Sequence, residues 1–248
     1  MLRAFAAALL AATVGPAASA PFASETPVPI LMYHVIAPPP PGAPYPDLYV
    51  RPSDFSAQMR WLKRHGYHAV TLQRVYDHWT KGSTLPARAI VISFDDGYLS
   101  QYTRAYETLR RYHWPGVENL EVNFLQPVGG LRPWRVRSMI AAGWEIDAHT
   151  LTHPDLTHLD DAELRRQVAG SRATIRRDFH VPVNFFCYPS GRYDARVIAE
   201  VRSAGFLAAT TTTYGLARPP NLYTLDRIRI NGSDGLSGFV AKLRSLTR

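Results

Sequence analysis

The feature that most constrains the fold is a repeated alternation between short apolar runs and segments with helical periodicity. Short apolar runs bounded by turn residues are typical of buried strands. When helices separate such runs, the pattern indicates a parallel sheet covered by helices. We expect seven or eight strands in a closed or nearly closed α/β barrel, at residues 28–34, 67–72, 89–94, 120–125, 144–149, 183–188, 206–212 and 223–230.

Most of the intervals between these runs have apolar residues at helical spacing. Ser53 is placed to cap the first helix, Gly66 to end it, and Asp160 with Glu163 forms a candidate capping box. No internal repeat or linker divides the chain, so we expect a single domain. The main helices are expected at residues 53–66, 101–112, 133–143, 160–179, 194–203 and 235–246.

The first 20 residues resemble a secretory signal, because Arg3 precedes an apolar run that ends in small residues up to Ala20. The alternative is a membrane anchor, but the apolar run is short for a bilayer span. We therefore expect cleavage after Ala20. The remaining domain, residues 21–248, should be secreted or periplasmic, monomeric and without a further membrane-spanning segment.

The formal net charge of +8 is spread along the chain. Without a Lys/Arg block or a DNA-reading motif, the charge does not predict nucleic-acid binding. A loose attraction to anionic envelope polymers fits it better. Cys187 is the only cysteine, so no disulfide can form within the chain, and its apolar surroundings favour a buried, inert thiol over a nucleophile.

Functional groups of such barrels lie where the strands end. Asp95 and Asp96 follow one expected strand, and His149 and His153 follow another. Imidazole nitrogens, a carboxylate and a water are typical ligands of catalytic zinc. One aspartate could bind the ion while the other accepts a proton from the attacking water. Alone, the aspartate pair could be a simple turn and the histidines a surface coincidence; together at strand ends they favour a metal site.

Three segments resemble motifs of the polysaccharide deacetylases that share the NodB-type catalytic domain, over roughly residues 28–232. They are "SFDDG" (93–97), "HTLTH" (149–153) and "FCYPSG" (186–191). The resemblance implies a distorted (β/α)7-type barrel and a divalent ion, usually zinc. It also implies that Asp95 is the base and that the metal ligands are Asp96, His149 and His153.

Two departures from the family pattern point to a subgroup. Residues 186–191 lack the arginine that often steadies the catalytic aspartate, and residues 222–232 lack the usual acid histidine. With the "LMYH" opening (31–34), this resembles enzymes that deacetylate poly-β-1,6-N-acetylglucosamine. That subgroup implies His34 as the general acid. Apart from the metal pair, His34 alone among nine histidines ends an expected strand facing the long loops. The alternative is a histidine that only orients a neighbour.

The family also implies that the backbone N–H of Tyr188 stabilises an oxyanion, whereas a packed aromatic is the other interpretation. The expected function is metal-dependent removal of N-acetyl groups from an extracellular polysaccharide that contains N-acetylglucosamine. One alternative is an O-acetyl esterase of the xylan type. Another is a non-catalytic sugar-binding descendant, although such a protein needs no spare base beside its metal.

Overall fold

The computed structural model describes residues 22–126 and 128–247. The proposed signal, residues 1–20, lies outside these residues, so its cleavage stays a prediction. Among the described helices, none combines the length and apolar character that a membrane crossing requires.

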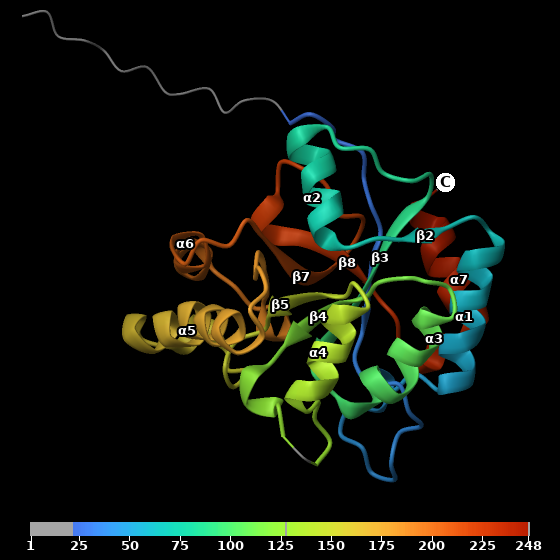
Figure 1. The fold of residues 1–248 in the computed structure, drawn as a ribbon, viewed down its shortest axis with the longest axis horizontal. Helices are drawn as coiled ribbons and strands as arrows, with labels where there is room; N and C mark the ends of the chain where they lie inside the picture. Colours follow the sequence, from blue (N-terminus) through green and yellow to red (C-terminus); the bar gives the residue numbers. More distant parts are fainter. Residues whose placement is uncertain (1–21, 127, 248) are drawn as a thin grey trace, which may run out of the picture.

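Eight parallel strands form the centre of the molecule (Figure 1). Seven of them close into a ring, because β1 pairs with both β8 and β3, while β2 pairs with β3 outside the ring. The expected distorted (β/α)7-type barrel in a single domain is confirmed. The strands are β1 (Ile30–Tyr33), β2 (His68–Ala69), β3 (Ala89–Asp96), β4 (Val117–Leu120), β5 (Glu145–Ala148), β6 (Phe185–Cys187), β7 (Ala208–Tyr214) and β8 (Leu225–Arg229).

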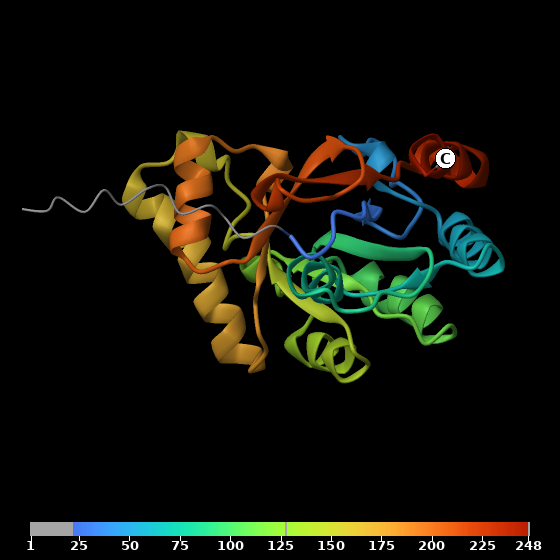
Figure 2. The same cartoon turned by 90° about the horizontal axis from the view of Figure 1, so that it is seen from above.

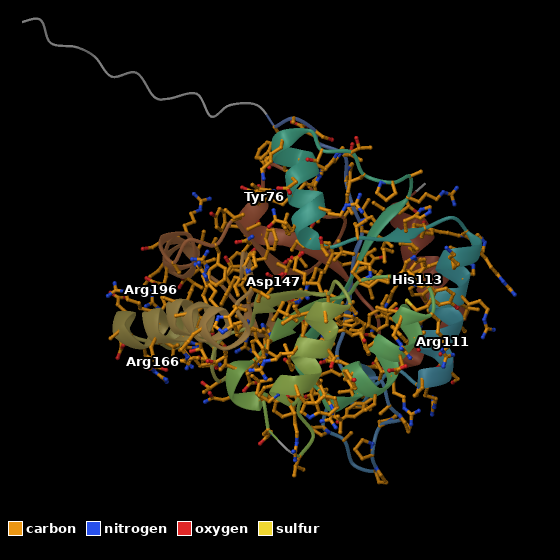
Figure 3. All side chains as sticks on the ribbon, viewed as in Figure 1. Tyr76, Arg111, His113, Asp147, Arg166 and Arg196 are labelled. Atoms are coloured by element: carbon orange, nitrogen blue, oxygen red, sulfur yellow. The ribbon has the colours of Figure 1, made fainter. Side chains whose placement is uncertain are left out.

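Helices surround this ring, with α1 beside α7 on one side and α5 beside α6 on the other (Figures 1 and 2). Arg166 and Arg196 extend outward from α5 and α6 (Figure 3) and pair with Glu163 and Asp161. The helices are α1 (Pro52–Arg64), α2 (Leu72–Lys81), α3 (Glu107–Arg110), α4 (Pro133–Ala141), α5 (Asp161–Phe179), α6 (Ala195–Ser203) and α7 (Gly235–Leu246).

The alternation of side chains along β3 divides the core into two parts. Ile92 and Phe94 join the large apolar cluster under the outer helices. Val91 joins a smaller cluster with interior residues of other strands and with Trp79 of α2. Successive side chains of a strand point to opposite faces, so Asp95 follows Val91 on the inner face. The fold thus carries Asp95 toward the carboxyl end of the barrel interior.

A strand boundary and a helix cap were predicted wrongly, for physical reasons. The strand expected at 120–125 ends at Leu120, because the chain then turns through a 3₁₀ segment, Val122–Phe124. Its true start was hidden by the buried polar residues Glu118 and Asn119. Ser53 does not cap α1, which begins at Pro52, where the missing proline N–H removes one unsatisfied donor.

The stretch expected as one helix at 101–112 is instead a π-helical turn, Gln101–Tyr106, followed by α3. In this turn the Gln101 side chain reaches back to the site, where its amide donates to the backbone carbonyls of His34 and Asp95. The irregular turn therefore ties the ends of β1 and β3 together. π-helical turns are often found at functional sites.

Candidate active site

Asp95 is held inside the barrel by side chains from two other strands. Asn119 of β4 donates to its Oδ1 at 2.7 Å, and the two terminal nitrogens of Arg227 on β8 donate to its two carboxylate oxygens at 2.8 Å each. Only 2% of Asp95 is exposed. Burial alone would raise the pKa of this carboxyl, but the Arg227 guanidinium holds it well below its usual range. Asp95 is therefore fully ionised.

The sequence interpretation missed Arg227. It looked for an arginine in residues 186–191, whereas the guanidinium comes from β8 and is fully buried. Its Nε also donates to the Thr211 carbonyl at 2.7 Å. The available signal was a charged residue within an apolar run. An arginine in such a strand is expected to be buried, and a buried arginine requires a carboxylate or another hydrogen-bonding partner.

Asp96 points away from this pair toward two imidazoles. Its Oδ1 lies 3.4 Å from His149 Nε2 and 3.8 Å from His153 Nε2. All three ligand atoms lie within 4.8 Å of one another. Ligand bonds of about 2.0–2.1 Å to tetrahedral zinc would separate neighbouring ligand atoms by roughly 3.3–3.4 Å. The spacing thus fits a small divalent cation after slight closure.

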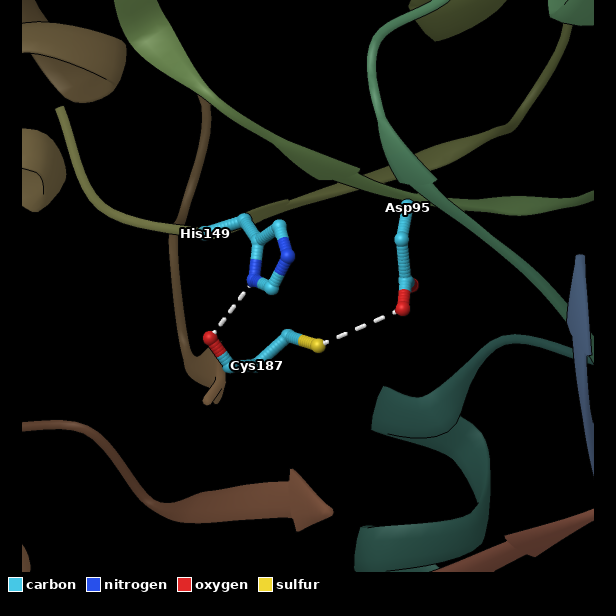
Figure 4. A group of neighbouring side chains, drawn as sticks. All are labelled: Asp95, His149 and Cys187. Carbon is cyan, nitrogen blue, oxygen red and sulfur yellow. Dashed lines mark hydrogen bonds between the residues drawn. The ribbon is translucent and has the colours of Figure 1, made fainter. Parts of the chain in front are cut away.

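Two further observations support that fit. Asp96 Oδ1 is buried and has no hydrogen-bond donor among the described residues, which is costly unless a cation meets it. His149 Nδ1 lies 2.7 Å from the Cys187 carbonyl oxygen, as Figure 4 shows. A carbonyl can only accept, so Nδ1 carries a proton, and Nε2 is the ring nitrogen that faces Asp96 and is left for a metal. The donor set suits zinc or a similar ion.

Cys187 is fully buried, as predicted, and lies beside the Asp95 carboxylate (Figure 4). Its sulfur is 3.7 Å from Asp95 Oδ2 and 3.2 Å from an Arg227 nitrogen. Cys187, Asp95 and His149 could also be counted as a metal cluster. The guanidinium already neutralises Asp95 there, so the set with Asp96 is the better cation site.

The three loops that meet here have backbone conformations that L-residues rarely adopt. Asp96, Thr150, His153 and Ser190 all have positive φ, between 53° and 83°. Each costs roughly 1 kcal/mol or more, and such residues cluster at functional sites. Gly97, with a φ of 99°, provides a sharp turn directly after the aspartates.

His34 directly follows β1 and lies in the wall of the site, where the sequence placed it. Its Nε2 is 3.9 Å from Asp95 Oδ2, and 12% of its side chain is exposed. Burial lowers its pKa, Asp95 and Asp96 oppose that shift, and Arg227 and Arg229 add to it. Its role as the acid remains a prediction.

Tyr188 follows β6 and is fully buried. Its backbone N–H donates to the Thr210 carbonyl at 3.2 Å, and its hydroxyl donates to the Tyr223 carbonyl at 3.0 Å. Because the amide already has an acceptor, this geometry counts against the oxyanion role and favours the packed aromatic. The oxyanion assignment stays an untested prediction.

These groups lie at the base of a cavity of about 840 Å³ at the carboxyl end of the barrel. Tyr45, Tyr98 and Phe124 line one side of it, and Arg192, Thr212 and Arg229 also contribute to its lining. Another cavity, of about 720 Å³, lies beside the starts of β1 and β3, and no carboxylate lines it. Of these two cavities within the described residues, the first is the one lined by Asp95 together with Asp96, His149 and His153.

Comparisons with known proteins agree with this geometry. The family model described as polysaccharide deacetylase matches residues 82–209, about half of the chain. An Escherichia coli (strain K12) poly-beta-1,6-N-acetyl-D-glucosamine N-deacetylase is 40% identical over 237 residues, covering 78% of this chain but only 35% of that protein. The enzyme of the same name from Staphylococcus aureus (strain N315) is 27% identical, covering 73% and 68%.

Solved structures with the same fold include a polysaccharide deacetylase from Bacillus cereus, with a TM-score of 0.78 and 28% identity, covering 88% of this chain and 69% of that one. A Streptococcus pyogenes deacetylase in complex with acetate has a TM-score of 0.82 at 24% identity, covering 88% and 99%, which supports the fold alone. With the family match and the site taken together, the chain belongs to the polysaccharide deacetylase family.

Proposed function

We propose that this protein is a metal-dependent N-deacetylase of an extracellular polysaccharide that contains N-acetylglucosamine. The observation that carries the proposal is the convergence of Asp96, His149 and His153 beside the ionised Asp95. The names of the Escherichia coli and Staphylococcus aureus relatives support the polymer and the N-acetyl bond. The signal-like pattern of residues 1–20 supports action outside the cytoplasm.

Asp96, His149 and His153 would hold the divalent cation, with zinc as the expected ion. When bound, the cation supplies Lewis-acid polarisation of the acetyl carbonyl and lowers the pKa of the attacking water. The protein's own part is to fix the ligands. The Cys187 carbonyl sets the tautomer of His149, and the positive-φ turns aim Asp96 and His153 at one point.

Asp95 would accept the proton of the attacking water while the water oxygen bonds to the acetyl carbon. Arg227 and Asn119 orient the carboxylate and keep it ionised. Because these donors lower the pKa of Asp95, they also make it a weaker base. Proton transfer to Asp95 therefore requires that the pKa of the attacking water is lowered as well. The charged, oriented carboxylate is ready without reorganisation.

The carbon–nitrogen bond can break only if the leaving amine receives a proton. His34 lines the cavity with its Nε2 3.9 Å from Asp95 Oδ2, so we assign it the acid role. Burial lowers its pKa, and a neutral imidazole must gain a proton before it can donate one. The products are acetate and a polymer with one free amine.

The proposal is tested by measuring acetate release from a β-1,6-linked N-acetylglucosamine oligomer and from acetylated xylan. We expect release from the oligomer, its loss after chelation, and its return when zinc is added. Release from xylan alone would indicate an O-acetyl esterase instead.

Elemental analysis tests the ligand set separately. Asp96→Ala, His149→Ala and His153→Ala should each lose bound metal, because every removed ligand leaves an open coordination position. His158→Ala is the matched control, since His158 lies on the same segment but pairs with Asp155. Full metal occupancy in all three ligand variants would contradict the assignment.

A further inference from the structure

Arg229 is a second arginine on β8 and has a different position from Arg227. The two are separated by one residue, so their side chains lie on the same face of the strand. Arg227 is fully buried, whereas Arg229 ends the strand, is partly exposed and lines the cavity of the site. Arg229 therefore lies one step nearer to the mouth of the barrel, in the lining of the cavity that would receive the sugar.

Arg229 differs from Arg227 and Arg192, the other arginines near the site, because its side chain has no partner among the described residues. Arg227 is paired with Asp95, and Arg192 is paired with Asp155 at 2.6 Å. Within residues 22–126 and 128–247, no carboxylate lies within 4.0 Å of the Arg229 guanidinium, and its side chain donates no hydrogen bond. Among its polar groups beyond the strand ladder, the Arg229 backbone carbonyl accepts a hydrogen bond from the Lys242 ammonium. An unmatched positive charge therefore faces the cavity.

The other charges of the cavity do not cancel this one. Arg227 neutralises Asp95, and Asp96 faces the imidazoles. Glu121 also lines the cavity, but within residues 22–126 and 128–247 it forms no ion pair with Arg229. Asp47 is exposed and accepts a hydrogen bond from the Ser233 N–H, so water screens it more strongly than Arg229.

We propose that Arg229 is a specificity-determining residue that disfavours sugar units whose acetyl group has already been removed. The proposal rests on the proposed N-deacetylase function, which converts a neutral amide into an amine that becomes a cationic ammonium. Arg229 repels the ammonium but not the acetamide. It would thus speed product release and disfavour attack next to a unit that has already reacted, leaving the free amines spaced along the polymer.

Calorimetric binding to the metal-loaded protein tests this without relying on turnover. The probes are a β-1,6-linked glucosamine tetramer, with its amines protonated, and the corresponding glucose tetramer, which is neutral and has a hydroxyl in place of each amine. In Arg229→Gln, glucosamine binding should tighten by about three- to tenfold, the order expected for one unit charge several ångströms away in a half-solvated cavity. Glucose binding should change by less than about twofold.

Two control variants use the same probes. Arg229→Lys retains the charge and should keep the wild-type preference for the neutral tetramer. Asp47→Asn removes a negative charge from the same cavity, so it should weaken glucosamine binding slightly. Added salt should shrink the difference between wild type and Arg229→Gln, because screening weakens charge repulsion.

An unchanged ratio of the two affinities in Arg229→Gln would overturn the proposal, as would an equal loss of both tetramers, which indicates hydroxyl binding instead. A melting curve of Arg229→Gln like that of wild type verifies that the variant is folded. Failure of the wild type to release acetate would count against the proposed function, whereas the affinity ratio tests Arg229 alone.

Discussion

The barrel contains two pairs of neighbouring carboxyl groups, Asp95 with Asp96 at the end of β3 and Glu145 with Asp147 on β5. The first pair meets cationic and hydrogen-bonding groups: Arg227 binds Asp95, and two imidazoles face Asp96. The Arg227 charge outweighs burial and keeps the pKa of Asp95 far below its usual range. This pair is ionised and ready for a metal.

Among the described residues, no cationic side chain pairs with Glu145 or Asp147, the second pair. The Phe185 N–H donates to one oxygen of Asp147, and the Gln73 N–H donates to one oxygen of Glu145. The other oxygen of each has no partner among the described residues. Burial raises the pKa of both groups, and the neighbouring Glu145 charge raises that of Asp147 further. Asp147 lies near the middle of the ribbon in Figure 3, and the raised pKa values allow one proton to be held between the two carboxyl groups.

This comparison shows that a neighbouring fixed cation, rather than the degree of burial, determines which acidic pair is ionised. Asp95 and Asp147 are equally inaccessible to water, with 2% and 0% exposed. A buried carboxyl without a cation becomes neutral. Of the two pairs, the one beside Arg227 therefore presents ionised carboxylates to the cavity.

The largest expected effect comes from changing Asp95 to asparagine. The amide cannot accept the proton of the attacking water, and loss of a general base costs about 10²–10⁴-fold in rate. Metal content should stay near wild type, because Asp95 is not in the ligand set. Acetate release by the metal-loaded variant is the measurement. Asp147→Asn makes the same chemical change away from the site and should retain activity; near-normal rates in Asp95→Asn would require another base.

Arg227→Met should unfold more easily than wild type. It leaves Asp95 buried without its partner, and breaking a buried ion pair in this way costs about 3–5 kcal/mol. Urea denaturation measures this change. The double variant Asp95→Asn with Arg227→Met removes both charges and should recover part of the loss. If the double variant were less stable by the full sum of both single changes, the two residues would not be coupled.

His34→Gln separates proton donation from positioning. An N-acetyl substrate needs a proton on its leaving amine, whereas an activated acetyl ester does not. The variant should therefore lose roughly 10²-fold more activity on the amide than on the ester, the usual scale of general-acid catalysis. Rates on both substrates with metal-loaded protein give the comparison. Equal losses would assign His34 to positioning, and the acid would have to be sought elsewhere.

Sequence patterns predicted the parts of the site that obey a local rule. Apolar runs indicated where β3 and β5 end, and barrel geometry then brought their following residues to one rim. Asp95, Asp96, His149 and His153 all follow that rule and lie together in the structure. Their roles depend on the variants described above.

Other parts depend on contacts that no local rule supplies. Arg227 lies 132 residues after Asp95 and meets it only across the closed ring. The hydrogen bond that engages the Tyr188 amide depends on the register between β6 and β7. The start of β4 was missed because Glu118 and Asn119 are buried polar residues, which period-two patterns treat as exposed.

The smallest expected effect is that of Asp147→Asn, which should stabilise the folded protein, whereas the other variants lose stability or activity. Folding raises the pKa of Asp147 above its unfolded value, so the folded state binds more protons between these two values. Stability contributed by this group is therefore fully present below the unfolded pKa, near 4, and declines as the pH rises toward the folded pKa. Asparagine stays neutral throughout, and its amide can donate to the Glu145 carboxylate in place of the shared proton.

The variant should thus equal wild type near pH 4 and become progressively more stable than wild type as the pH rises toward 8, because each pH unit over which folding suppresses ionisation costs the wild type about 1.4 kcal/mol. Urea unfolding at both pH values measures the change. The identical substitution at Asp95 should destabilise at both, since it leaves Arg227 without its carboxylate. A destabilised Asp147→Asn at pH 8 would mean that a cation, rather than a proton, lies between Glu145 and Asp147, and the two ends of the barrel would then be alike.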